Sequence, residues 1–219
     1  MSYRAVVFDL GGVVLGSPIH AIQRYESQIG LDKNSINRVV ADTAPHGAWS
    51  RLERGEITIE TFYTAFEVDC RDAGYQISAR TMFEWMAEES QPRPAMLSAI
   101  RAIRARGLMV GALTNNWVQE PENTGSKDGS RALSEFFDVF IESSVEGLRK
   151  PDPRIYRLAC ERLGVEPREV IFLDDIGANL KPARELGLTT IKVDEPGTAL
   201  EALAENLGFP LDEPVREKT

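Results

Sequence analysis

Three carboxylates of this 219-residue chain come directly after short apolar runs. Asp9 follows residues 5–8, and the pair Asp174-Asp175 follows residues 170–173. If both runs are strands of one parallel sheet, the three acidic side chains meet at the same edge of that sheet. Carboxylates gathered in one place repel each other unless a cation lies between them, and hard oxygen ligands suit Mg²⁺. The pattern therefore indicates a divalent-cation site.

Two further polar positions suit the binding of a phosphate group. Thr114 follows the apolar run 108–113, and Lys150 lies in the segment GLRKPDPRIY. A hydroxyl and an ammonium group both donate hydrogen bonds to phosphate oxygens. Taken singly, Asp and Thr at strand ends are more often turn or helix-cap residues than catalytic ones. Their occurrence at the ends of three strands is what favours a functional site.

The elements that must position these residues alternate between short strands and helices. The apolar runs and glycine stops predict strands at 5–8, 108–113, 139–142, 170–173 and 189–193, and helices at 95–106, 151–163, 178–186 and 199–207. This alternation is typical of βαβ units with right-handed crossovers. We therefore predict an α/β fold with three layers, in which helices cover both faces of a Rossmann-like parallel sheet.

The stretch between the first two predicted strands has a different pattern. Amphipathic helices follow one another there, with few strand signals and no nucleotide-binding glycine motif. We expect a small all-helical cap, inserted after the first strand, at 17–90. The α/β core then consists of 1–16 and 91–219.

The overall charge restricts the classes of partner. Acidic residues number 34 against 25 Lys and Arg, which gives a net charge of −9. Such a surface argues against nucleic acid as the partner, although one local cluster of donors suffices for a small phosphorylated substrate.

No apolar run reaches the length of a membrane span, and the N-terminal one is too short for a signal peptide. Because Cys70 and Cys160 also lack metal-type spacing, we expect a cytoplasmic protein with reduced thiols and no membrane partner; the sequence predicts no oligomeric state.

Four stretches resemble, in order, the motifs of the haloacid dehalogenase superfamily of hydrolases: FDLGGVV, LTNN, the lysine of GLRKPDPRIY, and FLDDIGANL. Their spacing is similar to that of members with a helical cap between the first two motifs. The segments EVIFLDDIGANLKPARELG and RLERGEIT resemble the N-terminal phosphatase domain of soluble epoxide hydrolases. They are also similar to the related N-terminal domain of some acyl-CoA dehydrogenases. The resemblance covers nearly the whole chain.

The resemblance implies a magnesium-dependent phosphatase that acts through an aspartyl-phosphate. By position, Asp9 is the nucleophile that attacks phosphorus. The metal ligands it implies are Asp9, Asp175 and the backbone carbonyl of Gly11, with Asp174 holding a metal-bound water. Mg²⁺ is the implied cofactor because it neutralises charge between the attacking carboxylate and the phosphoryl group.

The resemblance also assigns the phosphate-binding residues. Thr114 and the backbone of Asn115 would bind phosphate oxygens. Lys150 would bind the phosphate and offset negative charge on both the phosphate and Asp9, which makes it a catalytic residue as well.

Gly11 departs from the family pattern. Phosphatases of this superfamily usually carry a second Asp at this position, which protonates the leaving oxygen and then activates water; such help is worth about 10²–10⁴-fold. The favoured hypothesis is that the substrates have good leaving groups, as in sugar 1-phosphates, acyl phosphates or aryl phosphates. A second is that another residue, such as His20, supplies the proton. A third is that the chain is a weak catalyst and uses the site for binding.

Two alternative functions follow from the same family. One is a metal-independent haloacid dehalogenase, which uses the aspartate against carbon and also lacks the second acid; the acidic pair Asp174-Asp175 argues against it. The other is a catalytically weak binding or dimerisation module. The joint presence of Asp9, Thr114 and Lys150 with the acidic pair favours an enzyme.

Overall fold

A five-stranded parallel sheet forms the centre of the chain in a computed structural model that describes residues 2–118 and 133–211. The strand order is β3-β2-β1-β4-β5. The bounds are β1 (Ala5–Phe8), β2 (Met109–Thr114), β3 (Val139–Glu142), β4 (Val170–Asp174) and β5 (Thr189–Lys192). The predicted α/β class is confirmed, and each strand end lies within one residue of its prediction. Because β1 lies between β2 and β4, the residues that end these three strands come together.

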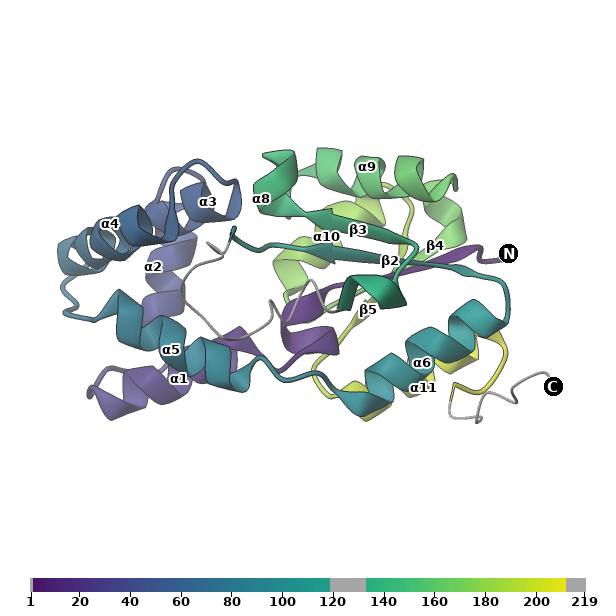
Figure 1. Ribbon diagram of the computed structural model, residues 1–219, viewed down its shortest axis with the longest axis horizontal. Coiled ribbons are helices and arrows are strands. Elements are labelled where there is room, and N and C mark those ends of the chain that lie inside the picture. The colour runs from purple at the N-terminus through teal and green to yellow at the C-terminus, as the bar shows by residue number, and fades with distance from the viewer. Residues whose placement is uncertain (1, 119–132, 212–219) are drawn as a thin grey trace.

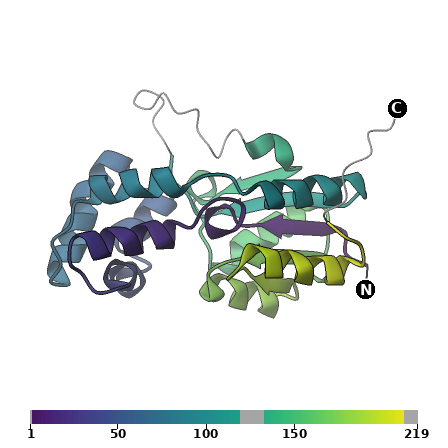
Figure 2. The ribbon, with the colours of Figure 1, turned by 90° about the horizontal axis from the view of Figure 1, so that it is seen from below.

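Helices cover both faces of the sheet, as Figures 1 and 2 show. One layer holds α6 (Pro94–Ala105) and α11 (Pro196–Leu207), and the other holds α9 (Pro153–Leu163) and α10 (Gly177–Glu185). Along β1, Val6 and Phe8 pack into the first layer's hydrophobic cluster, whereas Ala5 and Val7 pack into the second. This alternation has the period of a strand, and burial on both faces explains why the run is apolar throughout.

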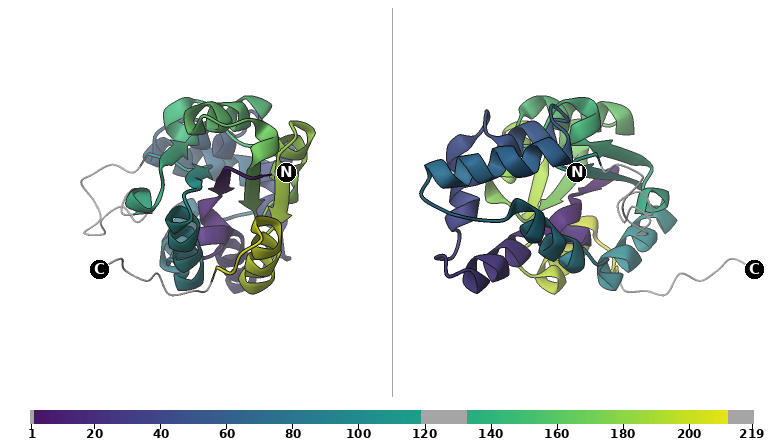
Figure 3. Two further views of the ribbon diagram at one scale, coloured as in Figure 1. Left: turned by 90° about the vertical axis from the view of Figure 1, so that its right-hand side faces the viewer. Right: turned by 60° about the vertical axis from the view of Figure 1, so that its left-hand side comes forward.

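Five helices form a separate group at one end of the sheet (Figures 1 and 3). They are α1 (Pro18–Gln28), α2 (Ser35–Thr43), α3 (Ala48–Glu53), α4 (Ile59–Asp72) and α5 (Ala79–Glu89). They bury a hydrophobic cluster of their own, in which the ring of Trp49 packs against those of Phe62 and Phe66. We therefore retain residues 17–90 as the proposed cap and use that word for helices α1–α5.

Buried carboxylates hold the cap helices together. Glu26 is fully buried and accepts hydrogen bonds from the backbone N–H groups of Asn34 and Ile36, both at 2.7 Å, at the start of α2. Asp69 and Glu67 accept from backbone N–H groups at the starts of α3 and α5. Helix N-termini present unpaired N–H groups, so carboxylates at these positions stabilise the cap.

The described helices give no candidate for a membrane span, because none combines the necessary length with enough apolar residues. The two cysteines, Cys70 and Cys160, are both buried and unpaired with each other.

Candidate active site

Asp9 lies at the end of β1, where the chain leaves the sheet in a wide turn over Leu10–Val14. The turn closes through a hydrogen bond of 2.8 Å from the Leu15 N–H to the carbonyl of Leu10. The Oδ1 atom of Asp9 accepts from the Leu10 N–H at 2.7 Å, which fixes the carboxylate above the sheet edge. Only 6% of Asp9 is exposed.

Lys150 connects two of the carboxylates. Its Nζ lies 2.8 Å from Oδ1 of Asp9 and 2.7 Å from Oδ2 of Asp174, and the residue is 1% exposed. Burial alone would lower the pKa of Lys150, but the carboxylates of Asp174 and Asp9 outweigh it and raise that pKa. The side chain is therefore an ammonium group at neutral pH. Burial raises the pKa of Asp9 well above its usual range, and the charge of Lys150 opposes that rise.

Asp174 has partners on both of its carboxylate oxygens. Oδ1 accepts from the Ile176 N–H at 2.8 Å, and Oδ2 accepts from Lys150. The side-chain amide of Asn179 lies 3.1 Å from each oxygen. The Asn179 carbonyl in turn accepts from the Tyr156 hydroxyl at 2.7 Å. Asp174 is thus fully buried and held in one orientation.

Asp175 is half-buried and lies directly over the glycine turn. A Cβ atom on Gly12 would lie 2.0 Å from its Oδ2 atom, and Gly12 has a φ of +77°. Glycine is therefore required at position 12 for two reasons, its backbone conformation and the close approach of the carboxylate. Burial, followed by the charge of Asp174, raises the pKa of Asp175 to about 6.

The three carboxylates form a set that fits one divalent cation. Each of Asp9, Asp174 and Asp175 offers an oxygen, and these atoms all lie within 4.8 Å of one another. Oxygen ligands bound directly to one Mg²⁺ ion are at most about 4.2 Å apart, so a limit of 4.8 Å suits a set in which one carboxylate binds the ion through a water. The structure thus brings together the acidic residues that the sequence placed at strand ends.

Thr114 ends β2 and is buried beside the carboxylates, as its position in the sequence predicts. The side chain of Asn115 has a contact that the sequence did not indicate. Its Oδ1 atom accepts from the Lys150 N–H at 2.8 Å, and its amide donates to the Lys150 carbonyl at 3.0 Å. Asn115 therefore holds the backbone of the lysine from both sides.

Two more residues of the site were not predicted. Asn179, which orients Asp174, follows it by five residues on α10; a buried amide in the first turn after the acidic pair was the available signal. Glu53 belongs to the cap, yet its Oε2 atom lies 2.5 Å from Nε of Arg149, next to Lys150. It falls within the quoted segment RLERGEIT, where only a contact between distant segments reveals its role.

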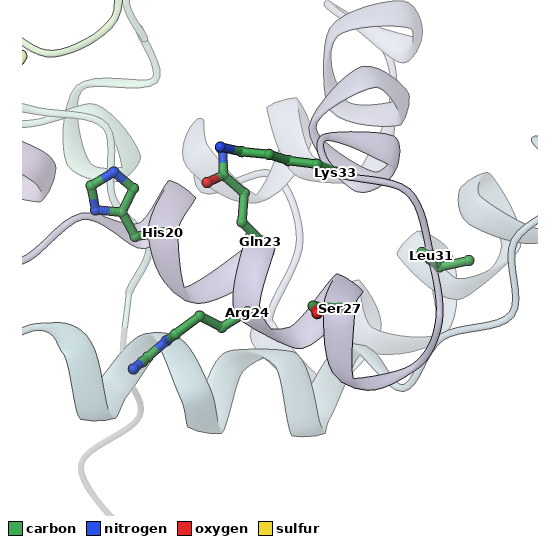
Figure 4. A pocket seen from close by; sticks show the side chains of 6 residues that line it. All are labelled: His20, Gln23, Arg24, Ser27, Leu31 and Lys33. Carbon is green, nitrogen blue, oxygen red and sulfur yellow. The ribbon is translucent and has the colours of Figure 1, made fainter.

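His20, considered as a replacement acid, is exposed on α1. It lines a pocket of about 500 Å³ on the cap, shown in Figure 4. Among the described residues, the hydrogen bonds to the Asp9 carboxylate come from Leu10 and Lys150. The other residues that line this pocket are Gln23, Arg24, Ser27, Leu31 and Lys33.

Trp117, three residues after Thr114, packs into the hydrophobic cluster of the cap. Its ring centroid lies 4.8 Å from that of Phe83 on α5. The segment that follows β2 therefore contacts the cap directly.

Comparison with known proteins identifies the class. The model of the haloacid dehalogenase-like hydrolases matches residues 3–187. The chain belongs to this family, as its motifs predicted. A solved structure of an enzyme of this family, bt-2542 from Bacteroides thetaiotaomicron, in complex with magnesium and inorganic phosphate, has the same fold. Its TM-score is 0.58 at 20% identity, over 87% of this chain and 94% of that one.

Three curated relatives are similar to most of this chain. The chain is 41% identical to acyl-CoA dehydrogenase family member 10 of Mus musculus and 36% identical to bifunctional epoxide hydrolase 2 of Sus scrofa. Both matches cover 96% of this chain. It spans only 20% and 40% of those two proteins. It is also 35% identical to phosphatase MT3486 of Mycobacterium tuberculosis, over 94% of both chains. Both predicted resemblances are thus confirmed.

Proposed function

We propose that this chain is a magnesium-dependent hydrolase of small phosphomonoesters and that it acts through an aspartyl-phosphate on Asp9. The observation that carries the proposal is the set of three carboxylates within 4.8 Å, two of which are bonded to the buried ammonium of Lys150. The naming of a relative of nearly equal length as a phosphatase supports it.

Each residue of the candidate active site has a part in the proposed reaction. Asp9, Asp175 and the carbonyl of Gly11 would hold Mg²⁺, with Asp174 acting through a water, and the ion would neutralise charge at the reacting centre. The Asp9 carboxylate forms a bond to phosphorus as the bond to the leaving oxygen breaks; water later releases inorganic phosphate and restores the carboxylate. Lys150 stabilises negative charge on the phosphoryl oxygens.

Thr114 and the backbone of Asn115 complete the proposed phosphate site. Both lie at the end of β2, beside the carboxylates at the ends of β1 and β4. The Asn115 side chain is occupied with the backbone of Lys150, so it leaves phosphate binding to its own N–H group. A small phosphorylated substrate would therefore bind between Thr114 and Lys150.

The proposed substrates have leaving groups that depart without a proton. The turn offers no carboxylate at Gly11, and His20 is exposed and lines the pocket on the cap. Inorganic phosphate release from a series of phenyl and alkyl phosphates tests this proposal. We expect kcat/KM to fall steeply as the pKa of the leaving alcohol rises; equal rates across the series would contradict the proposal.

Gly11→Asp should raise activity toward alkyl phosphates, because it introduces the missing general acid, whose help is worth about 10²–10⁴-fold. The backbone at Gly11 (φ −63°, ψ 127°) accepts a side chain. A Cβ atom there lies 3.1 Å from Cγ of Pro18, so we expect the full gain in the double variant Gly11→Asp/Pro18→Ala. Pro18→Ala alone is the control. Unchanged alkyl phosphate turnover in the folded double variant would show that the missing acid is not what limits the rate.

Magnesium should stabilise the chain more at pH 7 than at pH 5. The pKa of Asp175 rises from its ordinary 3.8 to about 6 in the folded chain. The folded state therefore binds a proton that the unfolded state lacks, and metal-free stability falls as the pH rises through this window. At pH 5 the ion must displace that proton, so its stabilising effect shrinks.

Thermal denaturation with and without MgCl₂ at the two pH values measures this effect. Asp175→Asn should reduce the magnesium-induced rise in Tm at both, whereas Asp194→Asn, an exposed residue paired with Lys192, should not. An equal rise at pH 5 and pH 7 in the native chain would contradict the coupling between magnesium binding and the proton on Asp175, and an unchanged rise in Asp175→Asn would rule out Asp175 as a ligand.

The two alternative functions receive less support. A metal-independent dehalogenase has no use for the additional carboxylates that converge on Asp9. A binding module does not need the bonds that fix Lys150, Asp174 and Asn179 around the site.

A further inference from the structure

Glu53 is a buried carboxylate that joins the cap to the core. It lies at the end of α3 and is 6% exposed. Its Oε1 atom accepts a hydrogen bond from the indole N–H of Trp49, within the cap, at 2.9 Å. Its Oε2 atom faces the core, where it lies 2.5 Å from Nε of Arg149 and 3.5 Å from the amide of Asn115. One oxygen is thus held by the cap and the other by the core.

The two core partners of Glu53 both adjoin Lys150. Arg149 precedes the lysine in the chain, and the Asn115 side chain bonds both its N–H and its carbonyl group. The lysine ammonium contacts Asp9 and Asp174. A continuous set of contacts therefore runs from the cap to the proposed nucleophile.

The ion pair between Glu53 and Arg149 differs from the other carboxylate contacts of the cap. Glu26, Asp69 and Glu67 accept backbone N–H groups within the cap and only stabilise its helices. The side chains of Glu53 and Arg149 are 8% and 18% exposed, so both lose most of their hydration when they pair. Removing one partner of such a buried pair strongly destabilises the folded protein, because the other charge is left buried without a partner.

Gly55 marks a second contact between the cap and the core. It has a φ of +68°, and a Cβ atom there would lie 2.4 Å from the carbonyl oxygen of Ser144, in α8 (Ser143–Glu146). The absence of a side chain at position 55 therefore lets the cap approach the core closely, two residues after Glu53.

We propose that Glu53 is a positioning residue: its bonds to Arg149 and Asn115 make the placement of Lys150 depend on the docking of the cap. The lysine would then be aligned for phosphoryl transfer only while the cap lies against the core. This inference rests on the proposed phosphatase function for its kinetic consequence, but the docking itself is testable without turnover.

Two pairs of variants separate docking from general stability. Glu53→Gln is matched by Glu26→Gln, since both alter a buried carboxylate of the cap and only the first reaches the core. Gly55→Ala is matched by Gly30→Ala: both glycines have positive φ, but a Cβ atom at Gly30 meets nothing within 4 Å. Thermal denaturation establishes that each variant is folded at the assay temperature.

The kinetic readout is magnesium-supported hydrolysis of p-nitrophenyl phosphate. A misplacement of about 1 Å costs on the order of 10²-fold in rate. We expect Glu53→Gln and Gly55→Ala to lower kcat by roughly 10- to 100-fold, with KM changed less than kcat. Glu26→Gln and Gly30→Ala should keep the native kcat. A native kcat in folded Glu53→Gln would overturn the inference.

The second readout is acetylation of Lys150 by acetic anhydride, followed by peptide mass spectrometry. Lys150 is buried in the native chain, whereas Lys33 and Lys181 are exposed and serve as internal references. We expect increased labelling of Lys150 relative to these references in Glu53→Gln and Gly55→Ala only. Equal labelling in all five proteins would refute the coupling. If the native chain hydrolyses nothing, the proposed function fails, and this readout still decides the inference.

Discussion

Asp9→Asn should abolish turnover of every phosphate ester and leave the fold intact. The amide is equal in size to the carboxylate but cannot form the bond to phosphorus, and loss of a covalent nucleophile reduces kcat by roughly 10⁴-fold or more. The amide oxygen can still accept from the Leu10 N–H and from Lys150, so the turn is retained. The measurement is kcat for p-nitrophenyl phosphate with Mg²⁺.

Asp194→Asn is the matched control, since Asp194 is exposed and bonded only to Lys192 among the ion pairs of the described chain. It should keep the native kcat. If Asp9→Asn retained more than one hundredth of native turnover after purification from an expression host lacking other phosphatases, Asp9 would not be the nucleophile.

Lys150→Met should reduce both turnover and stability. It removes the donor that stabilises phosphoryl oxygens, which is worth about 10²–10³-fold in kcat. It also leaves the buried carboxylates of Asp9 and Asp174 without their shared cation. Breaking a buried ion pair in this way costs about 3–5 kcal/mol, so we expect a lower free energy of unfolding in urea. Magnesium should recover part of this loss, because the ion restores positive charge between the carboxylates.

Lys181→Met, on the exposed side of α10, serves as the control and should change neither quantity. Native turnover in a folded Lys150→Met protein would remove the lysine from the proposed mechanism. A loss of turnover without any loss of stability would mean that the two carboxylates do not need Lys150 as their counter-ion.

The sheet was predictable because its strands are short apolar runs that end in polar residues. Buried parallel strands must be apolar on both faces, so residues 5–8 and 170–173 were identifiable without any partner information. The same reasoning placed Asp9, Thr114 and Asp174 at one edge, since the carboxyl ends of parallel strands lie together. The structure places all three there.

The contacts that orient the site were not predictable, because they join segments that are far apart in the chain. Asn115 and Lys150 are separated by 35 residues, and Glu53 and Arg149 by 96. Periodicity reports which face of a helix is buried, but it does not report what a buried polar atom contacts. The requirement for glycine at position 12 is of the same kind, since the overlying carboxylate belongs to Asp175.

The most direct test of the proposed chemistry is the hydrolysis of p-nitrophenyl phosphate by the native chain, with magnesium and again after EDTA. Its leaving group departs as a stable anion, so the missing acid at Gly11 has little effect and the assay isolates the nucleophile and the metal site. We expect turnover that requires magnesium and returns when magnesium is added back. Equal turnover in EDTA, or none from the folded protein with magnesium present, would contradict a magnesium-dependent phosphatase built on Asp9.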